Sequence, residues 1–250
     1  MAKQKKFELI SFANADELAA RVANLWLDEI KAANSSGKNF CVALSGGRIA
    51  QKFFAKTVQF AAARKISFDG VHFFWADERC VPPTDPESNF KLANELLFSP
   101  LKISAEKIHR LRGEIPPEAA LKIAETELRQ FALIENGWPV LDLIFLGMGE
   151  DGHVASLFQN AGQLPQNEAN CNSPFIFVDN SPKPPPRRIS LSFNAIATAK
   201  AVWVLASGIG KENALKESLR VEGQTPLARV IQLRSLTKVF SDVQDVVTNR

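Results

Sequence analysis

Apolar residues follow two different periods along the chain, and the two periods alternate. Short continuous apolar runs are typical of buried strands, whereas apolar positions three to four residues apart are typical of helices. Strands are predicted at 7–11, 40–44, 71–76, 141–146, 175–178, 189–193, 201–206, 230–233 and 239–240. Helices are predicted at 14–34, 48–63, 89–98 and 117–136. The alternation predicts an α/β fold with a doubly wound, mostly parallel sheet, helices on both faces and a Rossmann-like arrangement.

Local capping and turn residues support these boundaries. Asn14 is a favourable helix N-cap, and Glu17 follows at the capping-box position. The proline-rich stretch 181–186 is expected to be an ordered surface loop rather than an interdomain linker, because the strand pattern resumes directly after it. Residues 1–250 are therefore expected to form one domain, a length that α/β folds often reach.

The charge of the chain is balanced, which argues against nucleic acid as a partner. The sequence has 30 Lys and Arg residues against 27 Asp and Glu residues, for a formal net charge of +3. The basic residues are dispersed rather than gathered into runs. Binding through neutralisation of backbone phosphates needs a concentrated basic surface. We therefore expect no nucleic-acid partner.

The cysteines and the start of the chain indicate where the protein resides. Cys41, Cys80 and Cys171 are widely spaced and include no Cys-x-x-Cys pair of the zinc or redox kind. The start is basic, but no apolar run long enough for a signal peptide or a membrane span follows it. We expect an unprocessed cytoplasmic protein with no metal, no membrane contact and, in the absence of a surplus amphipathic stretch, a monomeric state.

Polar segments directly follow several predicted strands. In an open parallel sheet, ligands bind beyond the carboxyl ends of the strands, so these segments are the places to look for chemistry. The segments are 45–48, 77–79, 147–153 and 207–211.

Two of these segments are suited to an anion such as phosphate. Gly46 and Gly47 lead into a helix, so backbone amides and the helix N-terminus are available to a phosphate, and Arg48 in the first helical turn makes better sense facing an anion. Lys211 closes a second glycine turn, and Arg188 opens an apolar strand with Arg187 beside it. Taken singly, each has a plainer interpretation: a tight strand–helix turn, a solvated lysine or surface charge.

Residues 147–153 carry the strongest catalytic signal. This Gly-rich segment contains Asp151 and His153 two positions apart, close enough for the carboxylate to orient the imidazole. His72 and His109 lie inside predicted apolar segments and are expected to be structural. The chain has neither the nucleophile elbow of serine hydrolases nor the glycine motifs of nucleoside triphosphate and dinucleotide sites. No organic cofactor is expected.

Together these segments resemble the 6-phosphogluconolactonase family, within the wider group that also holds glucosamine-6-phosphate isomerases. The resemblance covers nearly the whole chain. It is carried by Asp-Glu-Arg-Cys-Val-Pro at 77–82 with Ser-Asn at 88–89, by Gly-Met-Gly-Glu-Asp-Gly-His-Val-Ala-Ser-Leu-Phe at 147–158, and by Ser-Pro-Lys-Pro-Pro at 181–185 with Arg-Ile-Ser at 188–190.

The resemblance implies hydrolysis of 6-phosphoglucono-δ-lactone in the oxidative pentose phosphate pathway, without metal or organic cofactor. It assigns the role of general base to His153, oriented by Asp151, and places Arg79 and Asp77 near the lactone. Arg79 would stabilise charge, and Asp77 would hold sugar hydroxyls or Arg79. The residues implied to hold the phosphate are Gly46, Gly47, Arg48, Arg188 and Lys211.

The chain departs from the family pattern at two places. Ile49-Ala50 replaces the usual hydroxyl residue and proline after the glycine turn, which removes one possible phosphate contact and predicts a lower phosphate affinity. Gln159 replaces a proline after Phe158, which changes the shape expected for that loop. Neither departure alters a proposed catalytic group.

Two alternatives remain open. Glucosamine-6-phosphate isomerase/deaminase resembles the chain at Asp77-Glu78 and at 151–153, but those enzymes carry Tyr after the Asp-Glu pair, and this chain has Arg79 there and no Tyr at all. They also carry an Asn-Glu pair where this chain has Leu157-Phe158. A non-catalytic sugar-phosphate-binding regulator would keep the phosphate anchors but has no need for Asp151 beside His153.

Overall fold

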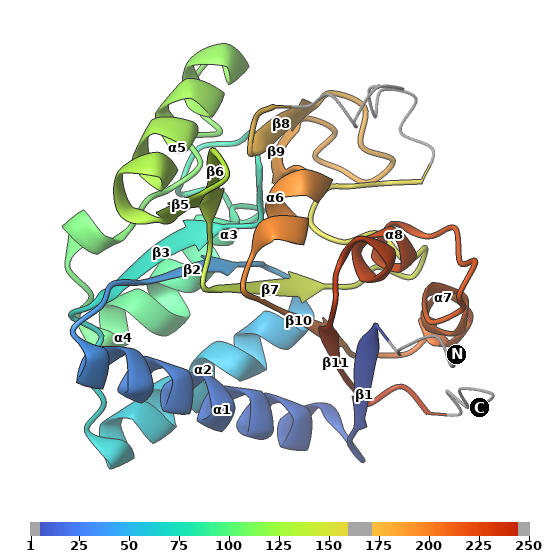
Figure 1. The fold of residues 1–250 in the computed structure, drawn as a ribbon, viewed down its shortest axis with the longest axis horizontal. Coiled ribbons are helices and arrows are strands. Elements are labelled where there is room, and N and C mark those ends of the chain that lie inside the picture. Colours follow the sequence, from blue (N-terminus) through green and yellow to red (C-terminus); the bar gives the residue numbers. More distant parts are fainter. Residues whose placement is uncertain (1–5, 160–171, 245–250) are drawn as a thin grey trace.

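A computed structural model of the chain describes residues 6–159 and 172–244. A parallel six-stranded sheet in the order β1-β11-β10-β7-β2-β3 forms its centre (Figure 1). Its strands are β1 (Phe7–Ser11), β2 (Phe40–Leu44), β3 (Val71–Trp75), β7 (Leu143–Gly147), β10 (Ala201–Ala206) and β11 (Thr237–Ser241). The predicted α/β fold with a doubly wound sheet is confirmed.

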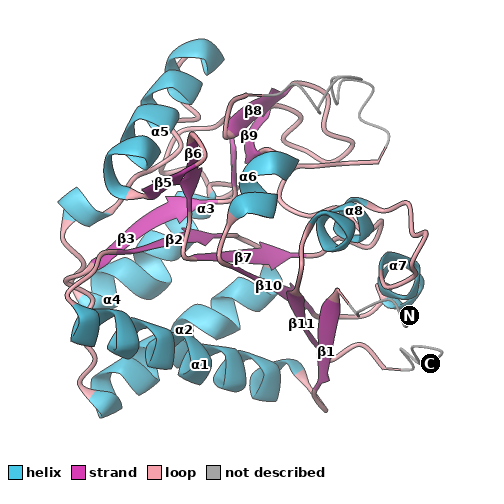
Figure 2. Cartoon of the chain, in the orientation of Figure 1, coloured by secondary structure: helices cyan, strands magenta, loops and turns pink. Residues whose placement is uncertain are grey.

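Helices cover both faces of this sheet. The helices α1 (Ala15–Ser36) and α2 (Arg48–Arg64) pack side by side on one face, and α6 (Phe193–Thr198) and α8 (Pro226–Leu233) lie on the other (Figures 1 and 2). The other helical segments are α3 (Asn89–Ala93), the π-helical turn η1 (Asn94–Phe98), α4 (Ser99–Leu101), the 3-10 turn η2 (Ala105–Lys107), α5 (Pro117–Phe131) and α7 (Glu212–Ser218). Within residues 6–159 and 172–244, we find no helix with the length and apolar character needed to cross a membrane.

The chain reverses its path across the sheet between β2 and β7. From β2 it moves outward to β3, returns to β7 on the other side of β2, and then continues away through β10 and β11. The register pairs Val42 with Leu143 and Ala43 with Ile144. The loops that follow β2 and β7 therefore leave the same edge of the sheet next to each other. In open α/β sheets, such a reversal creates the crevice in which ligands bind.

A smaller antiparallel sheet lies beside the first and consists of β4 (Asp77–Arg79), β9 (Arg188–Leu191) and β8 (Phe175–Val178) in that order. The sequence predicts strands at two of these segments but does not separate them from the parallel sheet. Residues 77–79, expected as a polar segment after a strand, themselves form β4. The register pairs Arg79 with Arg188 and Asp77 with Ser190. This sheet thus brings two of the predicted site segments together.

Two sequence predictions are wrong. The helix expected at 117–136 ends at Phe131, and the chain then forms a hairpin of β5 (Leu133–Glu135) and β6 (Trp138–Val140). Asn136 and Gly137 have φ angles of 50° and 82°, the pair of left-handed residues that a tight hairpin turn requires. Residues 230–233, expected as a strand, belong to α8. Thr225 caps that helix by accepting from the Ala228 amide.

The first helix confirms a predicted cap. Asn14 Oδ1 accepts hydrogen bonds from the amides of Asp16 (3.1 Å) and Glu17 (3.0 Å). Glu17 accepts from the Asn14 side chain rather than from its backbone amide, so the capping box is incomplete. The helix runs on to Ser36 and ends at Gly37, whose φ of 65° is the left-handed conformation common at helix ends.

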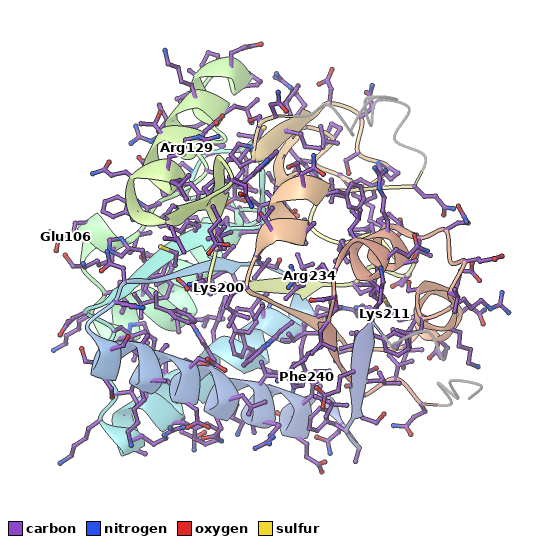
Figure 3. All side chains as sticks on the ribbon, viewed as in Figure 1. Glu106, Arg129, Lys200, Lys211, Arg234 and Phe240 are labelled. Atoms are coloured by element: carbon purple, nitrogen blue, oxygen red, sulfur yellow. The ribbon has the colours of Figure 1, made fainter. Side chains whose placement is uncertain are left out.

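The core fixes the sheet against its helices. Trp26 of α1 is fully buried, and its ring lies 5.4 Å from that of Phe53 in α2 and 5.2 Å from that of Phe145 in β7. On the opposite face, the buried guanidinium of Arg234 donates to the carbonyls of Ile196, Ala197 and Ala199 at the end of α6 (Figure 3). The Arg234 contacts satisfy the carbonyls that a helix end leaves unpaired. Trp26 thus packs against β7, whose end carries the candidate site, and Arg234 fixes the end of α6 on the opposite face.

Candidate functional site

A pocket opens at the reversal between β2 and β7. It is lined by side chains and backbone from both sheets. Its lining residues are Ser45, Gly46, Gly47, Arg48, Ile49, Asp77, Arg79, Asn89, Gly147, Met148, Gly149, His153, Ala155, Arg188, Ser207 and Lys211. Of the nine site residues expected from the sequence, eight line this pocket, and the ninth, Asp151, lies directly behind His153.

Asp151 and His153 form a hydrogen-bonded pair at the pocket wall. His153 Nδ1 lies 2.5 Å from Asp151 Oδ1, and the imidazole packs against the ring of Phe158 with 4.5 Å between centroids. When Nδ1 carries the proton that it donates to the carboxylate, Nε2 presents a lone pair. The pair therefore holds a base in one tautomer.

The charge of Asp151 is maintained by its neighbours. Partial burial by itself raises the pKa of Asp151, but the hydrogen bond and charge of His153 lower it more, and Lys183 Nζ, 3.9 Å from the carboxylate, adds to this effect. The pKa of Asp151 is consequently held below its usual range. The carboxylate therefore stays ionised and is a strong acceptor for the His153 N–H.

The backbone under this pair has no space for a side chain. A Cβ on Gly149 would collide with Nδ1 and Cε1 of His153 and would lie 2.6 Å from Asp151 Oδ1. Gly149 also donates its amide to the His153 carbonyl, at 2.9 Å, and so closes the turn. Glycine at this position therefore allows the imidazole to lie directly over the loop.

Asp77 is buried, at 5% exposure, and is held by residues far from it in the chain. Ser156 Oγ donates to Asp77 Oδ2 at 2.7 Å, and Asn89 Nδ2 donates to the Asp77 carbonyl at 2.9 Å. Arg188 Nη1 lies 4.0 Å from the Asp77 carboxylate and donates to Ser156 Oγ at 3.4 Å. Asp77 thus pairs with Arg188 through Ser156, rather than with Arg79 as one of the two sequence-based expectations had it.

Arg79 approaches the pocket from β4. One end of its guanidinium, Nη1, donates to the Glu87 carbonyl at 2.7 Å and lies 3.4 Å from the Glu87 carboxylate. Its Nε is buried and has no hydrogen-bond partner among the described residues. The Arg79 side chain lines the pocket and brings positive charge to its wall.

Glu78, between Asp77 and Arg79, has a structural role. Its carboxylate accepts from the amides of Arg79, Asn89 and Phe90 and from the Ser88 hydroxyl. Burial raises the pKa of Glu78 to about 7 even though the backbone donors act in the opposite direction. The carboxylate anchors the start of α3, and with it Asn89, against β4.

The part of the pocket formed by the loop after β2 and the turn before α7 is suited to an anion. Gly47, the N-cap of α2, has a φ of 98° and no side chain to occupy the helix N-terminus. A Cβ on Gly46 would collide with Asn89, so this backbone also approaches its neighbour closely. Arg48 and Lys211 add positive charge at the same end. Backbone amides, a helix N-terminus and two cations are the usual elements of a phosphate site.

Lys211 lies at the start of α7 (Figure 3). Burial and the charge of Arg48 lower the pKa of Lys211 to about 8. The turn before it is fixed by Asp242, which accepts from the Ser207 hydroxyl at 2.9 Å and the Gly208 amide at 3.1 Å. Lys211 is thus held at the pocket and loses its charge within a physiologically accessible pH range.

Arg188 is only 3% exposed, and much of its hydrogen-bonding capacity is already used. Its guanidinium donates to the carbonyls of Lys183, Pro184 and Pro185 in addition to the Ser156 hydroxyl. These bonds clamp the proline-rich loop at 181–186, which is the ordered surface loop expected from the sequence. Arg188 therefore positions Lys183 beside Asp151 as well as lining the pocket.

The other two histidines do not line this pocket. His72 Nδ1 and His109 Nε2 are 2.9 Å apart in the core, which confirms the structural assignment of both. Over the residues that the structure describes, no three His, Cys, Asp or Glu side chains are placed to hold a metal ion. Cys171 lies outside those residues.

Sequence reasoning missed Asn89, Ser156 and Lys183 as site residues. Each falls within a family-like segment, at 88–89, 147–158 or 181–185, so the segment was found but the individual residue was not. Ile49, one of the two departures from the family pattern after the glycine turn, lines the pocket beside Gly47 with an apolar side chain.

Comparison with known proteins gives a consistent result. The family model described as glucosamine-6-phosphate isomerases/6-phosphogluconolactonase matches residues 13–239. The 6-phosphogluconolactonase of Haemophilus influenzae is 37% identical over 204 residues, which are 80% of this chain and 84% of that protein. The enzyme of the same name from Treponema pallidum is 32% identical, covering 82% of this chain and 80% of its own length.

A solved structure extends the likeness to the fold. The crystal structure of 6-phosphogluconolactonase from Thermotoga maritima superposes with a TM-score of 0.76 at 29% identity. The superposition covers 94% of this chain and 98% of that chain. The fold is therefore shared over almost the full length of the two proteins.

Proposed function

Because this chain belongs to the glucosamine-6-phosphate isomerase/6-phosphogluconolactonase family, we propose that it hydrolyses 6-phospho-D-glucono-1,5-lactone to 6-phospho-D-gluconate. The observation that carries the proposal is the His153–Asp151 pair in the same pocket as the anion-binding elements of α2 and α7. The pocket thus offers both a base and positive charge. Hydrolysis of a phosphorylated lactone requires a base to activate water and positive charge to hold the phosphate.

The reaction requires little beyond these groups. His153 Nε2 takes a proton from a water molecule whose oxygen attacks the lactone carbonyl carbon, and the carbonyl oxygen gains negative charge. The guanidinium of Arg79, which lines the pocket, is suited to stabilise that oxyanion. When the bond between the carbonyl carbon and the ring oxygen breaks, the imidazolium of His153 returns its proton to the ring oxygen. The product acid then loses a proton to the solvent.

The remaining assignments place the substrate. Gly46, Gly47, Arg48 and Lys211 hold the phosphate, with Arg188 contributing from the second sheet. Asp77 accepts a sugar hydroxyl. The enzyme acts as a cytoplasmic monomer in the oxidative pentose phosphate pathway, and the reaction uses no cofactor because a lactone carbonyl is already electrophilic.

The direct test generates the lactone in place from glucose 6-phosphate with its dehydrogenase and records acid release at fixed pH. We expect a rate above spontaneous hydrolysis that is proportional to protein concentration. A second reaction with glucosamine 6-phosphate, followed by ammonia release, tests the isomerase/deaminase activity of the wider family, and we expect none. Binding of 6-phosphogluconate without any acceleration of lactone hydrolysis would instead support a non-catalytic regulator.

Lys211→Met is expected to raise KM for the phosphorylated lactone by roughly tenfold, because a charged hydrogen bond contributes about 1.5–3 kcal/mol. Steady-state kinetics with phosphorylated and unphosphorylated gluconolactone measure the effect. The slow reaction of the unphosphorylated lactone should scarcely change. Lys216→Met, on the exposed side of α7, is the matched control. Equal losses with both substrates would show that Lys211 supports the fold or the chemistry instead. Arg188→Leu should also raise KM for the phosphorylated lactone. That change additionally removes the hydrogen bonds that hold the proline-rich loop.

The affinity for 6-phosphogluconate should also depend on pH through Lys211. Since the pKa of Lys211 is lowered to about 8, its positive charge is present below that pH and is lost as the pH rises through it. Calorimetric titrations of the parent should therefore show binding that weakens above about pH 8. The same titrations of Lys211→Met should lack this step, and a step that persists there belongs to another group.

Gly149→Ala is expected to lower kcat tenfold or more, because its methyl group would occupy the position of the His153 ring and a displacement of about 1 Å can cost up to about 10²-fold in rate. KM should change little, since the phosphate end of the pocket is untouched. Gly70→Ala, at a glycine of ordinary φ far from the site, serves as the control. Parent-like kcat in Gly149→Ala would mean that the imidazole does not need this position.

A further inference from the structure

Glu150 has no part in the chemistry described so far, although it stands directly before Asp151 in the loop that follows β7. Its side chain points toward the anion-binding end of the pocket. Glu150 Oε1 lies 3.9 Å from Arg48 Nη2. A Cβ built on Gly210 would lie 3.7 Å from Glu150 Cγ and 3.8 Å from its carboxyl carbon, so the carboxylate lies over the turn that leads to Lys211.

The three charged side chains are electrostatically linked. Arg48 disfavours the charged form of Lys211, whereas Glu150 favours it. The backbone brings the two loops together as well, because a Cβ on Gly208 would lie 3.9 Å from Arg48 Nη2. Arg48, Glu150 and Lys211 thus form one cluster, with a carboxylate beside the two cations assigned to the phosphate.

Glu150 is also free to leave this position. The side chains of Arg48 and Glu150 are 81% and 60% exposed, and the pair is at the outer limit of an ion-pair distance. Ion pairs as exposed as this contribute little to stability. A doubly charged phosphate would bind the same cations more strongly than one carboxylate does.

We propose that Glu150 is a competing anion of the phosphate subsite, which pairs with Arg48 in the empty pocket and is displaced when a phosphorylated ligand binds. Its negative charge weakens the binding of the phosphorylated product and so speeds product release. The inference rests on the proposed function in taking the natural ligand to be a sugar phosphate. Competition between the carboxylate and a phosphate for Arg48 does not depend on lactone hydrolysis.

Glu150→Gln tests the proposal because it removes the charge and keeps the size of the side chain. Isothermal calorimetry with inorganic phosphate and with 6-phosphogluconate is expected to give dissociation constants about three- to tenfold lower than those of the parent at low salt, with a smaller difference at high salt. Glu217→Gln, which makes the same charge change in a residue paired with Arg220 on the surface, is the control and should bind as the parent does.

Affinity that is unchanged or weaker in Glu150→Gln would overturn the proposal, as would equal tightening in Glu217→Gln, which would reflect net charge alone. Absence of phosphate binding in both the parent and Glu150→Gln would overturn it too. In kinetic assays, the Glu150→Gln enzyme should show a lower KM and stronger inhibition by added 6-phosphogluconate. Failure of the proposed function would be seen separately, as a parent protein that does not hydrolyse the lactone while the calorimetric comparison still gives its result.

Discussion

Replacement of His153 by alanine is expected to lower kcat for lactone hydrolysis about 10²–10⁴-fold, the usual contribution of a positioned general base. The imidazole lines the pocket, and its Nδ1 is bound to Asp151, which leaves Nε2 to accept a proton from water. In the proposed function the phosphate is held by Gly46, Gly47, Arg48 and Lys211 rather than by His153, so affinity for 6-phosphogluconate should remain close to that of the parent. Stopped-flow or continuous titration of acid release measures the rate.

The variant His153→Gln separates chemistry from packing. A glutamine amide can fill much of the same space and donate a hydrogen bond to Asp151, but it cannot accept a proton at neutral pH. We therefore expect His153→Gln to be about as inactive as His153→Ala while keeping the parent's thermal stability. A folded His153→Ala protein with parent-like turnover at neutral pH would show that the base is another group.

Asp151→Asn is expected to lower kcat about 10²-fold or more, as found for orienting carboxylates in other hydrolases. The oxygen of Asn can still accept from His153 Nδ1 and from the His153 amide, but the negative charge is lost. The side chain then no longer stabilises the imidazolium that forms when His153 takes a proton from water. KM should change much less than kcat, because Asp151 lies behind the imidazole and does not line the pocket.

Asp179→Asn provides a matched control, because Asp179 pairs with Arg187 on the surface near the proline-rich loop. It should have parent-like kcat. The ¹⁵N chemical shifts of the His153 ring report its hydrogen bonding and should change in Asp151→Asn but not in Asp179→Asn. Unchanged turnover in Asp151→Asn would assign the orienting role to a different carboxylate, with Asp77 the next candidate.

Features set by local sequence were predicted well. The Asn14 cap depends on amides two and three residues away, and the alternation of strands and helices is enough to predict the parallel sheet. The pocket was found because loops at the carboxyl ends of parallel strands must meet, whatever their separation in sequence. Gly46 and Gly149 are recognisable as glycines, but the neighbours that require them, Asn89 and His153, become evident only in three dimensions.

Features that depend on distant partners were not predicted. Ser156 and Asp77 are 79 residues apart, and nothing near Ser156 in the sequence indicates that its hydroxyl binds that carboxylate. The antiparallel pairing of β4 with β9 likewise joins segments separated by more than a hundred residues. The two errors in secondary structure have local causes. The helical pattern was extended to residue 136, although Asn136-Gly137 is a typical hairpin turn. The short apolar run at 230–233 fits a buried helix as well as a strand.

The two sheets that meet at the pocket also divide its tasks. The loops that follow strands of the parallel sheet carry His153, Asp151 and the phosphate-binding turns, while the antiparallel sheet supplies Asp77, Arg79 and Arg188. Under the proposed assignment, the first sheet carries proton transfer and most of the phosphate contacts, whereas the second supplies Asp77 to a sugar hydroxyl, Arg79 to the oxyanion and Arg188 to the phosphate. A substitution at Asp77 that keeps Arg79 and Arg188 therefore offers an evolutionary route to new phosphorylated lactones that leaves proton transfer intact, and it gives protein engineers a defined position to randomise first.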